Sequence, residues 1–152
     1  MAIIYFDIVF PKSLLSEVKM SKFFEWEDSL NLHINEMDSE HKQIVHYMNE
    51  LYECYEKKSD KSVYEPILKD LYNYTVKHFK DEEEFFSKLD YPQADSHKYI
   101  HKDLLSKLDQ NAKIVSEKGL NEDLFFFLKM WLTAHISGID MIYGEIANKK
   151  VA

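Results

Sequence analysis

The chain has few of the residues that interrupt helices or cross-link loops. Its 152 residues include only three glycines, three prolines and one cysteine, Cys54. So little glycine and proline favours long helices and an all-α protein. One cysteine excludes an internal disulfide and agrees with a reducing cytoplasm. We expect Cys54 to be a small helix side chain without special reactivity.

Basic residues are also scarce. Nineteen of them stand against 27 acidic residues, which gives a net charge of −8. This balance leaves no broad basic surface, and it argues against nucleic acid or an anionic membrane as a partner. The length fits one domain with a core large enough to fold unaided.

The first nineteen residues stand apart from the rest. An apolar run over residues 3–10 contains one charge, Asp7. The run is too short to span a bilayer, and it lacks the basic start and cleavage site of a secretory signal. We expect residues 1–19 to be an N-terminal extension, either disordered or a misassigned start, with Met20 beginning the domain of residues 20–152. A short docked arm or a peripheral anchor is the alternative interpretation.

Hydrophobic periodicity predicts four helices. The first has Asp38 as a plausible N-cap and runs to about Lys57. The second starts between Ser62 and Pro66, because a capping box at Ser62 and a first-turn proline are competing signals that leave the start open. Its predicted buried stripe comprises Ile67, Leu71, Tyr74, His78, Glu82 and Phe85.

The third predicted helix runs from about Asp95 to Lys118, where Gly119 supplies a C-terminal stop. The fourth begins after Asn121, a good N-cap. The connections between the segments are short, so neighbouring helices should pack antiparallel. The sequence therefore predicts an antiparallel up-down-up-down four-helix bundle.

Five of the seven histidines fall on the apolar faces of these helices. His41 stands alone, whereas His78 is followed four residues later by Glu82, and His97 by His101. A spacing of four puts two side chains on the same helix face. One such histidine is more often a hydrogen-bonded core residue than a ligand. Five of them converging without a metal would leave many buried polar atoms, each costing about 1–3 kcal/mol.

The fourth helix carries its two candidate ligands at a different spacing. His135 and Asp140 are five residues apart, which is about 140° on a straight helix. Both can reach one site only if the helix bends or loosens across Ser137 and Gly138, so we predict a break or wide turn there. The candidate set then holds seven donors. That is too many for one ion, and it indicates a dinuclear centre in which imidazole and carboxylate favour iron, zinc or manganese.

The acidic run Asp81–Glu84 divides into two kinds of residue. Glu82 lies on the buried face, where a carboxylate needs a cation or must take up a proton. We interpret the other three acids of the run as solvated. His33 and His46 fall outside the candidate set, and we interpret both as ordinary surface residues.

The combined motifs resemble the hemerythrin family, and its single-domain bacterial members, the bacteriohemerythrins, most of all. The similarity covers about residues 22–147. The motifs are Asp38-x-x-His41-Lys42, His78-Phe79-x-x-Glu82-Glu83, His97-x-x-x-His101 and Trp131-x-x-x-His135-x-x-x-x-Asp140. The resemblance implies a non-haem di-iron centre with an oxo or hydroxo bridge. Its metal ligands would be His41, His78, Glu82, His97, His101, His135 and Asp140.

The resemblance also implies how these ligands are shared. One iron takes three imidazoles and the other takes two, while both carboxylates and the oxo or hydroxo group bridge them. The second iron then keeps one open position, where the family binds O₂. The two imidazole sets are His97, His101 and His135, and His41 and His78, with Glu82 and Asp140 as bridges.

An apolar pocket must protect the bound ligand from water. Leu132, one turn before His135, is the residue we expect to line it, and the further candidates for its wall are Trp26, Phe79 and Ile136. Trp131 and Tyr143 match aromatic positions of the family and are expected to support the ligands.

The first function expected is reversible O₂ binding for storage, delivery or buffering, without enzymatic activity. The alternatives are a sensor of O₂ or redox state and a di-iron oxidase or peroxidase. Carboxylate-rich bundle sites favour O₂ activation, so five imidazoles against two carboxylates favour the carrier. We expect a cytoplasmic protein with O₂ as its ligand and an unidentified oxygen-using or signalling partner.

Overall fold

The structure is a computed structural model that describes residues 22–151. The predictions for residues 1–19 and for a start at Met20 therefore lie outside the described residues. The elements, in chain order, are the 3₁₀ turn η2 (Asp28–Leu30), α1 (Asn35–Glu56), α2 (Lys61–Ser87), α3 (Ala94–Lys118), α4 (Glu122–His135), the π-helical segment η3 (Ile136–Asp140) and α5 (Met141–Val151).

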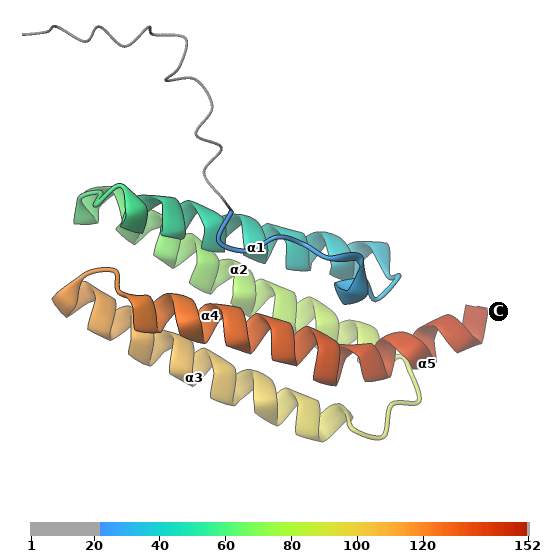
Figure 1. Ribbon diagram of the computed structural model, residues 1–152. Helices are drawn as coiled ribbons and strands as arrows, with labels where there is room; N and C mark the ends of the chain where they lie inside the picture. The colour runs from blue at the N-terminus through green and yellow to red at the C-terminus, as the bar shows by residue number, and fades with distance from the viewer. Residues whose placement is uncertain (1–21, 152) are drawn as a thin grey trace, which may run out of the picture.

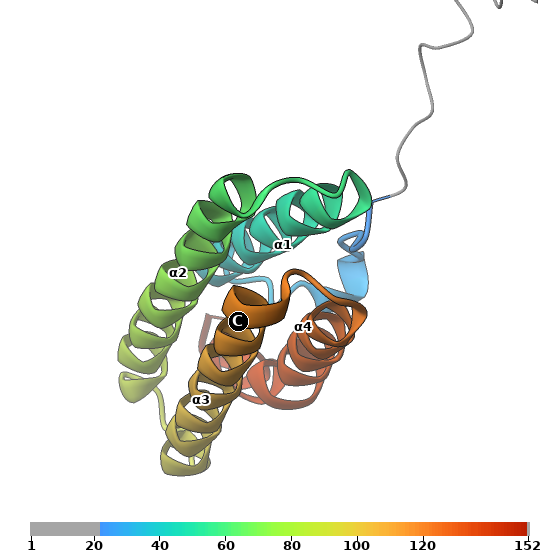
Figure 2. The same cartoon turned by 90° about the vertical axis from the view of Figure 1, so that its left-hand side faces the viewer.

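The helices form the predicted bundle. Figure 1 shows each of α2, α3 and α4 running back along the helix before it, with η3 and α5 continuing the line of α4. Along the bundle axis, α1 contacts α2 and α4, and α3 contacts the same two helices (Figure 2). The all-α, up-down-up-down architecture is therefore confirmed, and residues 22–151 contain no strand.

Two helix starts differ from the predicted ones. Helix α1 begins at Asn35, and Asp38 lies in its first turn, so the prediction of Asp38 as N-cap is wrong. Its buried carboxylate instead accepts hydrogen bonds from the backbone N–H groups of Leu32 at 2.7 Å and Ile34 at 3.2 Å. Asp38 thus holds the incoming loop against the helix.

Helix α2 begins at Lys61, with Asp60 as its N-cap. Neither alternative for this start is observed, because Ser62 makes no capping hydrogen bond and Pro66 lies inside the helix. Proline fits the first turn of a helix, where its missing N–H would have no helical partner. Pro66 lies just beyond that turn, so α2 lacks one helical hydrogen bond there.

The turn between α3 and α4 is formed as predicted. Gly119 follows α3 with a φ of 84°, in the left-handed region where glycine carries no side-chain penalty. Asn121 then caps α4, because its side-chain oxygen accepts a hydrogen bond from the N–H of Leu124 at 3.0 Å. The short turn returns the chain directly alongside α3.

The interior of the bundle changes character along its length. The end that carries the α1–α2 and α3–α4 turns is filled with aliphatic side chains, whereas the other end buries histidines and acids. Fully burying one aliphatic side chain contributes about 1.5–3 kcal/mol, so the apolar half stabilises the fold without help from the donor residues. Its fully buried members include Met48, Leu51, Leu71, Leu108, Leu124 and Leu128.

Candidate metal centre

All seven predicted donor residues come together at the polar end of the bundle. They arrive from every helix of it, and each side chain is at most 4% exposed. The set consists of His41 from α1, His78 and Glu82 from α2, His97 and His101 from α3, His135 from the end of α4 and Asp140 from the end of η3.

The donor atoms form two groups that share a carboxylate. One group comprises Glu82, His97, His101 and His135, and the other His41, His78 and Glu82, with the atoms of each group within 4.8 Å of one another. Asp140 also lies between the groups. Its Oδ1 is 3.0 Å from His135 Nε2, and its Oδ2 is 3.3 Å from His41 Nε2.

The wide turn predicted between His135 and Asp140 is confirmed. Residues Ile136–Asp140 form a π-helical segment, in which hydrogen bonds span five residues instead of four. The wider turn brings a residue and its fifth neighbour toward one face, so both side chains point into the bundle. Ser137 and Gly138, the two small residues of the turn, are exposed on its outer side.

The buried polar atoms of this end are mostly without hydrogen-bond partners. His41 Nε2 and both oxygens of Asp140 are close to each other, but none of them makes a hydrogen bond. The same holds for His78 Nε2 and Glu82 Oε2. An unpaired buried polar group costs about 1–3 kcal/mol. Atoms that converge without pairing fit a common cation, and imidazole with carboxylate is a suitable donor set for iron, zinc or manganese.

Two acids outside the predicted set fix the orientation of the histidines. Glu40 Oε2 lies 2.8 Å from His78 Nδ1, and Glu83 Oε1 lies 2.8 Å from His101 Nδ1. An ionised carboxylate only accepts hydrogen bonds, so each Nδ1 carries the proton and each Nε2 presents a lone pair to the centre. The interpretation of Glu83 as a merely solvated acid is therefore wrong.

Glu40 is held in its charged form. Burial opposes ionisation, but hydrogen bonds from His78 and Lys77 outweigh it and lower the pKa of Glu40 to about 2. The carboxylate can then accept from His78 throughout the physiological range. The sequence alone does not predict this role of Glu40, because its partner His78 belongs to another helix. The only sequence feature that points to Glu40 is its position beside His41.

Two tyrosines complete the surroundings of the donors. The Tyr143 hydroxyl donates to Glu82 Oε1 at 2.5 Å, so it supports a ligand candidate as expected. Burial and the nearby carboxylates raise the pKa of Tyr143 far above its ordinary value, which keeps the hydroxyl a donor. Tyr91, which was not predicted, places its hydroxyl 3.3 Å from His97 Nδ1.

The pKa values of the two central carboxylates are shifted in opposite directions, although burial opposes ionisation of both. Burial and the neighbouring Asp140 raise the pKa of Glu82. Burial also opposes ionisation of Asp140, but His135, His41 and His97 outweigh it and hold the pKa of Asp140 well below its usual range. Two buried acids thus compete for a limited positive charge. Divalent cations between them would let both ionise.

The histidines of the three-histidine group differ in their pKa shifts: despite burial, Asp140 and Glu82 raise the pKa of His135, whereas the pKa of His101 is lowered. Burial lowers the pKa of His101 to about 3, although the hydrogen bond to Glu83 opposes the shift. A neutral ring keeps its Nε2 lone pair free. Nε2 of His135 lies 3.3 Å from those of both His97 and His101, which places three nitrogens around one point.

Aromatic and aliphatic side chains enclose the centre. Phe79 stacks on His101 with centroids 3.8 Å apart, and Trp26 lies over His41 at 6.2 Å. Leu132 and Ile136 are almost fully buried on the helix that carries His135. Trp131 does not contact a donor through hydrogen bonding: its buried Nε1 has no partner, and its ring packs edge-on against Phe79.

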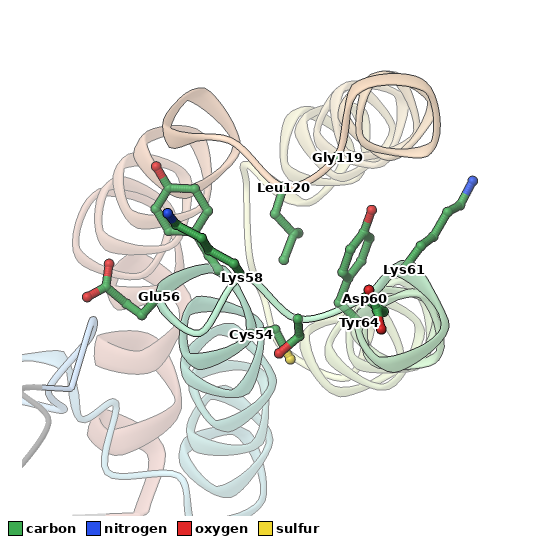
Figure 3. Close-up of a pocket in the computed structure, with 10 residues that line it drawn as sticks. Cys54, Glu56, Lys58, Asp60, Lys61, Tyr64, Gly119 and Leu120 are labelled. Carbon is green, nitrogen blue, oxygen red and sulfur yellow. The ribbon is translucent and has the colours of Figure 1, made fainter.

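The remaining candidates lie away from this centre. His33 and His46 are exposed, as predicted. Cys54 is buried and free. It lines a cavity of about 520 Å³ at the opposite end of the bundle, into which Leu120 points from the α3–α4 turn (Figure 3). None of the seven donor residues lines this cavity.

The fold and the buried cluster define a four-helix bundle with a candidate metal site at one end. A family model described as "Hemerythrin HHE cation binding domain" matches residues 32–147. That match covers most of the chain, and the protein belongs to the hemerythrin family.

Several known proteins resemble this chain over most of its length. A hemerythrin-like protein of Naegleria gruberi is 33% identical over 123 residues, which is 81% of this chain and 92% of the relative. Myohemerythrin of Riftia pachyptila is 32% identical over 120 residues, with 79% and 90% covered. Bacteriohemerythrin of Stenotrophomonas maltophilia is 27% identical over 121 residues, with 79% and 78% covered.

A solved structure agrees with these relatives. The crystal structure of a leucine-to-tyrosine mutant of hemerythrin superposes with a TM-score of 0.74 at 26% identity. The match covers 82% of this chain and 97% of the hemerythrin.

Proposed function

We propose that this protein binds O₂ reversibly at a non-haem di-iron centre. Membership of the hemerythrin family supports an O₂-binding non-haem iron protein. The observation that carries the proposal is the sharing of two carboxylates between unequal sets of histidines. In this proposal Glu82 and Asp140 would each help to hold both irons.

The unequal histidine sets explain where a small ligand would bind. His97, His101 and His135 would hold one iron together with both carboxylates. Only His41 and His78, with the same carboxylates, would hold the other iron, which leaves room there for a small ligand. When bound, the ferrous pair supplies the electrons that O₂ binding requires. The protein would hold the ligand next to His41 and His78 and exclude water from it.

The donor set also supports a carrier over an enzyme. Imidazoles outnumber carboxylates five to two in the cluster, whereas bundle sites that activate O₂ are dominated by glutamates. We therefore propose a non-enzymatic carrier, storage or delivery protein of the cytoplasm, which passes O₂ to an unidentified partner.

Metal analysis combined with air titration tests this proposal. We expect two irons per chain and, when air is added to the reduced protein, an oxygenated spectrum that reverts under vacuum. Rapid conversion to a stable ferric form would indicate an oxidase or peroxidase. Absence of stoichiometric iron would contradict both the carrier and the oxidase or peroxidase.

The role of Leu132 can be tested by truncation. In Leu132→Ala we expect autoxidation to accelerate several-fold with the iron content unchanged, because the smaller side chain admits water beside the ligand. The matched control is Leu128→Ala, one turn further from the centre on the same buried face. Both variants should lose a similar amount of stability, about 2–5 kcal/mol. Equal autoxidation rates in the two variants would remove Leu132 from the ligand pocket.

A further inference from the structure

The outer face of α4 carries an apolar stripe between its exposed charged residues, although the outer face of a surface helix is ordinarily polar throughout. Phe126 and Met130, one turn apart, are 71% and 54% exposed. Ala134 continues the line one turn later and is also exposed. The continuous helix from Glu122 to Lys150 is long and apolar enough to cross a membrane by length and composition, yet only 39% of its 18-residue apolar window is buried. We call Phe126, Met130 and Ala134 the outer stripe.

The first described residues of the chain lie next to this stripe. The ring of Phe23 packs edge-on against Phe125 with centroids 5.4 Å apart, and Lys129 Nζ lies 5.6 Å from the Phe23 centroid. A groove of about 630 Å³ separates the segment that begins at Lys22 from α4. It is lined on the α4 side by Lys129, Thr133 and Ser137. Lys22, where the described chain begins, therefore lies beside the Lys129 edge of the outer stripe, and on its other side it lines a groove with His46 and Asn49 of α1.

The preceding segment has the composition needed to cover the stripe. Residues 3–10 comprise seven apolar side chains and one charge, Asp7. Residues 11–21 can span up to roughly 35 Å when extended, and the stripe from Phe126 to Ala134 is only about 12 Å long. Lys129 is the charged residue beside the middle of the stripe, so a carboxylate at the middle of the apolar run is complementary to it.

We propose that residues 3–10 pack along the outer stripe of α4, with Asp7 beside Lys129. The proposal adopts the interpretation of residues 1–19 as a docked arm, and it names the outer stripe of α4 as the surface that the arm binds. A tethered segment competes at an effective concentration of millimolar order, which a second copy of the chain does not reach at micromolar concentration. A net charge of −8 disfavours an anionic lipid surface as the occupant.

Cysteine cross-linking in the full-length chain tests the proposal. In a Cys54→Ser background, we pair Phe6→Cys with Met130→Cys and follow intramolecular disulfide formation with diamide. The matched control pairs Phe6→Cys with Tyr99→Cys, an equally prominent aromatic that is 74% exposed on α3. Figure 2 shows α3 on the other side of α4 from the blue segment before α1. We expect the Met130 pair to close about tenfold faster, because docking raises the local thiol concentration. Equal rates would overturn the proposal.

A charge exchange tests the register of the arm. Lys129→Glu should slow closure of the Phe6–Met130 pair, and adding Asp7→Lys should restore it. If the double exchange leaves closure slow, Asp7 does not face Lys129, and the proposed register is wrong.

The competing occupants give different results. Concentration-dependent disulfide dimers of the single Met130→Cys variant would assign the stripe to a second copy. Flotation of the full chain with phosphatidylcholine–phosphatidylglycerol vesicles, abolished by Met130→Asp, would assign it to a membrane. Either result would overturn the docked arm.

Discussion

Replacing Glu82 by alanine should remove at least one iron per chain and lower the thermal midpoint by roughly 10 °C, corresponding to a loss of about 3 kcal/mol or more. Glu82 is the residue common to both donor groups, and it is completely buried. Its loss therefore weakens both proposed metal positions at once. Iron analysis and calorimetry of the purified variant measure the two effects.

A conservative variant separates metal binding from packing. Burial raises the pKa of Glu82 in the metal-free protein, so its carboxyl resembles the neutral amide of Glu82→Gln. We expect this variant to have nearly wild-type stability without metal and to show the full deficit only in the presence of iron. The matched surface control is Glu84→Ala, whose 67% exposed side chain pairs with Lys88. Normal iron content in Glu82→Ala would contradict the bridging role.

Lengthening η3 by one residue should also empty the centre. An alanine inserted between Gly138 and Ile139 turns Asp140 by about 100° around the helix. Its carboxylate would leave the donor groups, and Tyr143 would be turned away from Glu82. We expect loss of at least one iron and of several kcal/mol of stability, because a large buried side chain is displaced together with the ligand.

Shortening the same segment should be far less harmful. Deleting Ser137 leaves His135 and Asp140 four residues apart, the spacing that puts His78 and Glu82 on one face of a regular helix. The deletion should therefore convert η3 to an α-helical turn and retain both irons. Iron analysis of the two variants side by side gives the comparison. If the deletion loses as much iron as the insertion, the wide turn does more than set the direction of Asp140.

The parts of the structure that depend on spacing along one helix could be predicted. His78 with Glu82 and His97 with His101 follow from the helical repeat alone. The conflict between a five-residue spacing and a regular helix predicted the wide turn before Asp140. Spacing also predicted the four helices, because little else in the chain interrupts them.

The parts that depend on how helices face one another could not be predicted. In α2 the expected members Ile67, Tyr74 and Phe85 are only partly buried, whereas Leu68, Thr75 and Phe86 are buried. The apolar band of α2 is wide, so its centre is set by contacts with α1 and α3 and not by the band itself. For the same reason the sequence alone does not show that Glu83 turns toward His101 on α3.

The separation of the aliphatic interior from the donor cluster has a consequence for the metal-free chain. The end that carries the α1–α2 and α3–α4 turns can form on hydrophobic contacts alone, whereas the opposite end buries several polar atoms of acids and imidazoles that have no hydrogen-bond partner. Amide hydrogen exchange in the apoprotein should accordingly form a gradient, slow around Leu51 and Leu124 and fast around His97 and Asp140. Binding of iron would then order the donor end of a helix bundle whose other end is already formed.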